Sequence, residues 1–230
     1  MENKRKLSRI AGALYLVVVL TGMFSLAYVP KQLFVWDDPV KTFHNILDHE
    51  TMFRLSLASS VLCYVAFIFL PVVLYYLLRS VNGKIAKIMA LLAIVSVPIS
   101  LMNLQNKYHI LTIIDGLKQR NVQAGTEVDN QVMLYLNQYD NGILIATIFW
   151  GLWLLPFGYL VYKSDFLPKV LGILLMLGCF GYLINFFGNT LLGNYGAMGI
   201  SQYMGLLPAI GEIGTCLWLL FIGAKNKALN

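Results

Sequence analysis

The chain is poor in charged residues. Only 12% of its 230 residues are Asp, Glu, Lys or Arg, whereas a soluble domain of this length carries about a quarter. Hydrophobic residues make up 58% of the chain. This balance excludes an ordinary soluble domain and predicts an all-α polytopic membrane protein, whose surroundings are the lipid bilayer.

Basic residues outnumber acidic ones, and the formal net charge is +6. The Lys and Arg residues do not form the basic patch with interleaved aromatic residues that is typical of nucleic-acid binding. They border the apolar segments instead, which is the positive-inside pattern of membrane proteins. We therefore expect no nucleic-acid partner.

Cysteine and histidine are scarce, with three of each. The cysteines all lie in apolar segments without a CxxC neighbour, so we interpret them as small buried hydrophobic residues. His44, His49 and Glu50 lie close together and raise the hypothesis of a metal site. Because His44 and His49 are five residues apart, they would lie on different faces of a helix. We therefore predict no metal and no cofactor.

Six apolar segments are each long enough to cross a bilayer, which takes about 20 helical residues. The first segment, with Ser25 to Ala27, also resembles a signal peptide. Its length and the five segments that follow favour a transmembrane helix. We predict one six-helix domain over residues 1–230, with helices at 10–29, 52–78, 85–107, 142–162, 167–191 and 203–223.

Two longer links on the outer side show helical patterns. In the first link, Asp38 is placed as an N-cap and Pro39 as the first helical residue. Val40, Phe43 and Leu47 would form the apolar stripe of a short helix at the membrane surface. The second link, residues 108–141, predicts two more short helices. We favour packing at the membrane surface for them over a lid.

The distribution of basic residues predicts the orientation. The amino terminus, the turn at 79–87, the link at 163–169 and the carboxyl terminus hold 11 of the 17 Lys and Arg residues. The opposite links hold eight of the eleven acidic residues. This asymmetry places both termini in the cytoplasm, and we expect a multi-pass protein of the bacterial inner membrane.

Glu212 is the only acidic residue well inside an apolar segment. A charged side chain is costly there and asks for a structural or functional reason. Gly178 and Gly181 on the fifth helix, and Pro208 on the sixth, predict small-residue faces that pack on each other. In the structural interpretation, Glu212 is a neutral carboxyl group that donates a hydrogen bond to Asn185 or to a backbone carbonyl. The alternatives are proton or ion coupling, ligand binding, and a catalytic acid.

Further polar residues lie in the middle or outer half of the predicted helices. If their faces converge, they form a polar pocket that is open to the outside, with Arg54 near its mouth. The candidate residues are Arg54, Asn103, Gln105, Asn185, Asn189 and Glu212.

Several short stretches resemble a known bacterial family. They are Gly12-Ala13-Leu14-Tyr15-Leu16, Met52-Phe53-Arg54-Leu55, Phe166-Leu167-Pro168-Lys169-Val170-Leu171-Gly172, Gly181-Tyr182-Leu183, and Glu212 ahead of Leu217-Trp218-Leu219. In these stretches the chain resembles the domain of unknown function family DUF4386. The resemblance implies a multi-helix integral membrane protein and brings no activity, substrate, cofactor or catalytic residue with it.

Three functional hypotheses follow. The first is a non-enzymatic protein that binds a small molecule or ion in the outward pocket. The second is an accessory or sensory protein that acts through helix-helix contacts with partners. The third is an intramembrane enzyme, although the chain has no HExxH, GxSxG, Walker or Rossmann motif.

Overall fold

The computed structural model describes residues 2–121 and 125–224, and the regular structure within these ranges is helical. Six helical segments in them are long and apolar enough to cross a membrane. They run over Lys4–Leu33, Glu50–Leu78, Gly83–Arg120, Thr126–Lys163, Lys169–Leu191 and Ile200–Ile222. The predicted all-α polytopic membrane protein is confirmed.

Several of the six segments consist of more than one element. The ten α-helices of the described ranges are α1 (Glu2–Met23), α2 (Val29–Leu33), α3 (Pro39–Asp48), α4 (Glu50–Leu78), α5 (Gly83–Asn103), α6 (Gln105–Arg120), α7 (Thr126–Leu152), α8 (Leu154–Lys163), α9 (Lys169–Leu191) and α10 (Ile200–Leu217). A π-helical turn, Phe24–Tyr28, joins α1 to α2, and another, Trp218–Ile222, follows α10. A 3-10 turn, Tyr195–Met198, precedes α10.

The helix starts follow local sequence signals. The Asp38 side chain accepts a hydrogen bond of 2.9 Å from the Lys41 backbone N–H, and Pro39 opens α3, so the predicted cap is confirmed. Asn82 caps α5 in the same way, since its side chain accepts from the N–H groups of Lys84 and Ile85. These polar residues therefore fix where the helices begin.

Glycines let the helices of the predicted membrane part approach closely. A Cβ atom on Gly12 would clash with the backbone of Leu219 and Leu220, so α1 and the turn after α10 are in direct backbone contact there. Gly178 and Gly181 of α9 contact Pro208 of α10 in a similar manner. The predicted packing of small-residue faces is confirmed at these positions.

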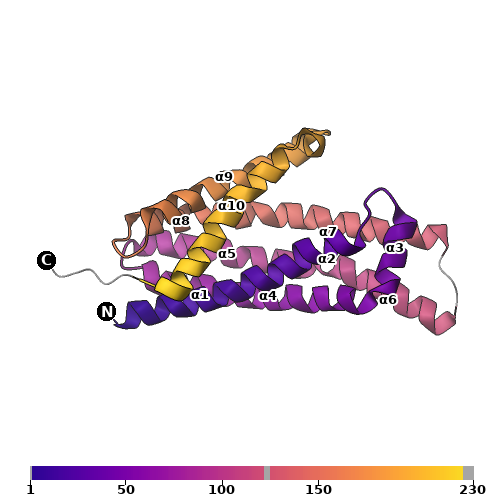
Figure 1. Ribbon diagram of the computed structural model, residues 1–230, viewed down its shortest axis with the longest axis horizontal. Coiled ribbons are helices and arrows are strands. Elements are labelled where there is room, and N and C mark those ends of the chain that lie inside the picture. Colours follow the sequence, from indigo (N-terminus) through magenta and orange to yellow (C-terminus); the bar gives the residue numbers. More distant parts are fainter. Residues whose placement is uncertain (1, 122–124, 225–230) are drawn as a thin grey trace.

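The links at the end away from the chain termini, which the sequence predicts to be the outer side, form a second packed bundle. Their buried side chains make a hydrophobic cluster of their own, which includes Phe43 of α3, Ile110 and Ile114 of α6, and Leu136 of α7. Figure 1 shows α6 and the first half of α7 continuing the long axis of α5 and α7. Residues 108–141 contain two helical stretches, α6 and the first half of α7, as predicted. The second is not a separate short helix, however, because α7 is continuous from Thr126 to Leu152.

The short helix in the first link also differs in register. The buried residues of α3 are Thr42, Phe43 and Ile46, whereas Val40 is exposed. The helix packs against α7, so its buried face is set by protein contacts.

The last hairpin leaves the main bundle at an angle. In Figure 1, α9 and α10 cross the long helices near the end where the chain begins, and their other ends lie away from the bundle. α1 contacts α10 and, where Gly12 meets Leu220, the π-helical turn that follows α10. This crossing brings Glu212 next to α1.

Candidate ligand site around Glu212

Two tyrosines hold the Glu212 carboxyl group. The Tyr15 hydroxyl donates to Oε2 at 2.9 Å, and the Tyr182 hydroxyl donates to Oε1 at 3.2 Å. Tyr15 lies on α1 and is fully buried, while Tyr182 lies on α9. Both carboxyl oxygens therefore accept a hydrogen bond from a neighbouring helix, and the side chain is fixed in one orientation.

Glu212 lines a cavity of about 120 Å³ among five helices. The lining residues are Val18, Gly22, Leu26, Cys63, Tyr64, Phe67, Trp150, Trp153, Tyr182 and Glu212. Half of them are aromatic, and Glu212 is the only lining residue with a carboxyl group. The cavity thus combines one fixed acid with a mainly apolar, ring-lined wall.

Trp153 organises the aromatic wall. It lies at the break between α7 and α8, is 1% exposed, and packs edge-on against Phe67 with ring centroids 5.3 Å apart. Its ring also lies 6.3 Å from that of Tyr15, which holds Glu212. Trp150 and Tyr182 form a further edge-on pair at 6.5 Å. These contacts connect the wall of the cavity to the tyrosines around the acid.

The predicted hydrogen bond between Glu212 and Asn185 is wrong. The Asn185 side chain donates to the Ser201 backbone oxygen at 3.1 Å and accepts from the Tyr195 hydroxyl at 2.8 Å. Asn185 therefore ties together the outer ends of α9 and α10. Glu212 lies further along α10, at the level where that helix meets α1.

The remaining outer asparagines have local partners. Asn189 is exposed, and its side chain donates to the Asn185 backbone oxygen at 2.8 Å. Asn103 donates to the Tyr139 backbone oxygen at 2.8 Å and accepts from Asn106 at 3.0 Å. Gln105 is exposed. Of the six predicted candidates, only Glu212 lines the cavity.

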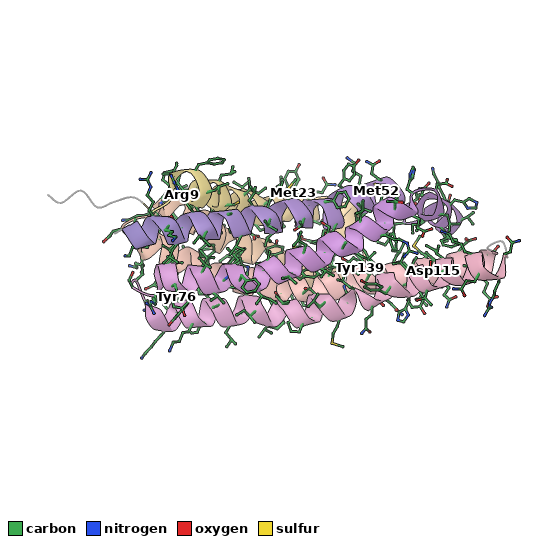
Figure 2. All side chains as sticks on the ribbon, turned by 90° about the horizontal axis from the view of Figure 1, so that it is seen from below. Arg9, Met23, Met52, Tyr76, Asp115 and Tyr139 are labelled. Carbon is green, nitrogen blue, oxygen red and sulfur yellow. The ribbon has the colours of Figure 1, made fainter. Side chains whose placement is uncertain are left out.

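Arg54 belongs to a separate charged network at the outer end. It pairs with Glu50, four residues earlier on α4, at 2.8 Å and with Asp115 of α6 at 2.6 Å. Lys118 also pairs with Glu50. Figure 2 shows Asp115 near the end opposite Arg9. The network links α4 to α6 and lies away from the Glu212 cavity.

Comparison with known proteins gives the family. A family model described as "Domain of unknown function (DUF4386)" matches residues 10–223. The chain belongs to this family. An uncharacterized protein of Archaeoglobus fulgidus is similar to this DUF4386 chain and is 30% identical to it over 154 residues, which are 67% of this chain and 75% of that protein. No solved structure matches the chain.

Residues from three of the stretches that resemble DUF4386 contact one another at Glu212. The stretch at Gly12 supplies Tyr15, the one at Gly181 supplies Tyr182, and the last contains Glu212. The two tyrosines were not among the predicted site residues, although each stood in a quoted stretch. Their spacing from a glycine at a helix contact was the signal that could have identified them, since such glycines mark where helices approach.

The site offers few ligands for a metal. Among the residues that the structure describes, no group of three or more His, Cys, Asp or Glu side chains is placed to hold a metal ion. The three cysteines are buried and form no disulfide. The chemistry that this DUF4386 protein presents at the cavity is therefore that of one carboxyl group, phenol hydroxyls and aromatic faces.

Proposed function

We propose that the protein is a non-enzymatic membrane protein that binds a small organic cation at Glu212. The observation that carries the proposal is a carboxyl group, fixed by Tyr15 and Tyr182, on the wall of an aromatic cavity. A carboxylate surrounded by Tyr, Phe and Trp rings is the arrangement that recognises ammonium and methylated ammonium groups. This replaces the six-residue outward pocket with one acid and its aromatic surroundings.

Magnitudes favour a cation over a neutral ligand. Each ring in van der Waals contact with a desolvated cation contributes about 0.5–2 kcal/mol, and a cation would also neutralise a carboxylate that is costly inside a membrane. The two tyrosine hydrogen bonds already orient the acid, so little ordering remains to be done on binding. A neutral apolar molecule would gain the ring contacts only.

The cavity size limits the ligand. A volume of about 120 Å³ is well below the roughly 300–1,000 Å³ of sites for drug-sized molecules. We therefore assign the ligand to the class of small primary to quaternary alkylammonium ions. The titratable groups on the cavity wall are Glu212, Cys63, Tyr64 and Tyr182, and they do not form a nucleophile, base and orienting acid. This supports a binding role over catalysis.

For the location, we propose a cytoplasmic membrane with both termini in the cytoplasm. The start of α1 and the end of the last π-helical turn lie at the same end of the molecule (Figure 1). In Figure 2, Tyr76 lies at the same end as Arg9, and Arg79 and Lys84 flank the turn between α4 and α5 that follows Tyr76. This agrees with the positive-inside rule. Lys225 and Lys227, which contributed to the predicted orientation, lie outside the described residues.

Tryptophan fluorescence tests cation binding, because Trp150 and Trp153 line the cavity. Detergent-purified protein would be titrated with methylammonium, tetramethylammonium and tetraethylammonium, all as gluconate salts at constant ionic strength. We expect a saturable change in emission for the smaller ions and a weaker one for tetraethylammonium. tert-Butanol, which is similar in shape to tetramethylammonium but has no charge, should give no saturable change.

Glu212→Gln and Asp115→Asn form a matched pair for this titration. The first removes the charge in the cavity and keeps the shape, so it should abolish the saturable change. The second removes an exposed acid at the outer end and should leave the change intact. If Glu212→Gln binds tetramethylammonium as well as the unmodified protein does, the proposed function is wrong.

A further inference from the structure

Lys107 is a buried lysine without an acidic partner among the described residues. It lies on α6, three residues after the break at Leu104, and its side chain is 0% exposed. Its Nζ atom has no hydrogen-bond partner among the described residues, and none of their carboxyl groups forms an ion pair with it. The contact that the structure gives it is with the Tyr139 ring, whose centroid lies 4.3 Å from Nζ.

The two phenol hydroxyls of this cluster also have no hydrogen-bond partner in the described ranges. The Tyr64 and Tyr139 hydroxyls face each other, with Ser100 beside the first and Ser60 beside the second. Neither phenol oxygen makes a hydrogen bond of acceptable geometry within the described ranges. The Ser60 and Ser100 hydroxyls donate to backbone oxygens of their own helices, each at 2.9 Å.

The free hydrogen-bonding capacity here is therefore mostly that of donors. Lys107 has three N–H groups, and each tyrosine has one O–H group. The amide of Asn103, which is close to Tyr139, is already used at both ends. The acid that is nearest in sequence to Tyr139 is Asp140, and its side chain is exposed. A cluster of unused donors around a buried ammonium group calls for an acceptor with negative charge.

The energies point the same way. An ammonium group removed from water costs several kcal/mol even after the protein relaxes, whereas one cation–π contact returns about 0.5–2 kcal/mol. The Tyr139 ring alone does not balance the charge. An anion held by the ammonium and the two phenol hydroxyls would provide both the missing charge and the missing hydrogen bonds.

Lys107 lies at the boundary between the two hydrophobic clusters. Lys107 lies between Leu104, which belongs to the inner hydrophobic cluster, and Ile110, which belongs to the outer one. In Figure 2, Tyr139 lies at the level of Met52, between the ends marked by Tyr76 and Asp115. The cluster is thus at the junction of the membrane part and the outer bundle, beyond most of the apolar length of α5.

We infer that Lys107, Tyr139 and Tyr64 form a binding site for a small monovalent anion of halide size. The site is distinct from the cation site proposed at Glu212, and Tyr64 is the residue that the two have in common, because it also lines that cavity. Chloride serves as the probe. Its binding does not depend on Glu212, so the two proposals can fail separately.

Thermal unfolding in detergent tests the anion site. The full chain would be melted at one pH and constant ionic strength while sodium gluconate is replaced by sodium chloride or bromide. A ligand at ten times its dissociation constant should raise the melting temperature by roughly 3–6 °C for a protein of this size. In addition, the ³⁵Cl NMR line of chloride should become broader when the protein is present, because bound chloride relaxes faster. A melting temperature that does not change with the anion would overturn the proposal.

Variants separate this site from a general salt effect. Lys107→Met keeps an unbranched side chain without the charge, and its melting temperature should not respond to halide. Tyr139→Phe keeps the ring and removes one donor, so it should need several-fold more chloride for the same shift. Lys118→Met, on the same helix but 61% exposed, should respond as the unmodified protein does. A full chloride response in Lys107→Met would refute the site.

Asp140→Asn tests the competing source of negative charge. If chloride binds at Lys107, this variant should keep the chloride response of the unmodified protein. If the unmodified protein lacks a response and Asp140→Asn acquires one, Asp140 is the counter-charge of Lys107 and the proposal is wrong.

Discussion

Glu212 and Lys107 are two ionisable residues with opposite surroundings. Glu212 has a hydrogen-bond donor on each carboxyl oxygen and open space beside it. Lys107 has an aromatic ring, two unused phenol groups and no carboxylate in contact among the described residues. The Glu212 carboxyl group is an oriented hydrogen-bond acceptor, whereas Lys107 and the two phenol groups are donors without an acceptor. Tyrosines thus surround both residues in different ways: their hydroxyls donate to the Glu212 carboxyl group, and a tyrosine ring lies against the Lys107 amine.

The largest expected effect comes from separating α1 from the π-helical turn after α10. This change should disturb the surroundings of Glu212 and leave those of Lys107 intact. In Gly12→Ala, the new methyl group would clash with the Leu220 backbone, which cannot move aside as a side chain can. We expect a loss of about 3 kcal/mol or more in unfolding free energy, measured by denaturant titration in detergent micelles.

Gly205→Ala is the control for that variant. Gly205 is also helical, but a Cβ atom added to it would have no neighbouring atom within 4 Å, so alanine should be neutral or stabilising by up to about 1 kcal/mol. The chloride response of Gly12→Ala, if it still folds, should persist. If both glycine variants lose the same unfolding free energy, the close contact at Gly12 is not the cause of the loss.

The next largest effect should have opposite signs at the two charges. Glu212→Leu leaves the Tyr15 and Tyr182 hydroxyls without their acceptor and should destabilise the protein by about 2–4 kcal/mol. Lys107→Met in gluconate buffer removes an unpaired buried charge and should be neutral or stabilising by about 1–4 kcal/mol. The same denaturant titration measures both. A large loss in Lys107→Met would mean that the ammonium group has a partner in the folded protein.

Two tyrosine-to-phenylalanine changes test whether a hydroxyl with a hydrogen-bond acceptor contributes more stability than one without. Tyr15→Phe removes a hydrogen bond to Glu212 and should cost about 1–3 kcal/mol. Tyr64→Phe removes a buried hydroxyl that has no hydrogen-bond partner in the described ranges, so without halide it should be neutral or slightly stabilising. Thermal unfolding in gluconate distinguishes the two. If both cost the same, Tyr64 is satisfied by a group such as bound water.

The parts of the structure that could be predicted are those with local causes. The lengths of the apolar runs gave the six spans, Asp38 and Pro39 gave the start of α3, and the glycines of α9 gave its contact with Pro208. The partners of Glu212 depend on the angle at which α10 crosses α1. That angle is a property of the whole bundle, so the sequence pattern led to Asn185 instead of Tyr15.

The outer bundle was misjudged for a related physical reason. An apolar stripe shows which side of a helix is buried but not what covers it. The helices predicted in residues 108–141 were assigned to a membrane surface, whereas Ile110, Ile114 and Leu136 of that link lie in one hydrophobic cluster. The burial of Lys107 was not predicted, because a lysine near the end of an apolar run usually extends its ammonium group into water. Its burial depends on α7, which a pattern within one helix does not reveal.

The smallest expected effect is at Arg54, an exposed charge that provides a baseline for the two enclosed ones. Its side chain is 42% exposed and pairs with Glu50 and Asp115. Exposed ion pairs contribute about 0–1 kcal/mol and weaken in salt. Arg54→Met should therefore cost no more than about 1 kcal/mol at low ionic strength and less at high ionic strength. Lys41→Met, which removes an exposed lysine that has no ion pair among the described residues, should show no such salt dependence. An Arg54→Met loss as large as that of Glu212→Leu would show that the outer network, and not the buried tyrosine contacts, dominates the electrostatic stability of the fold.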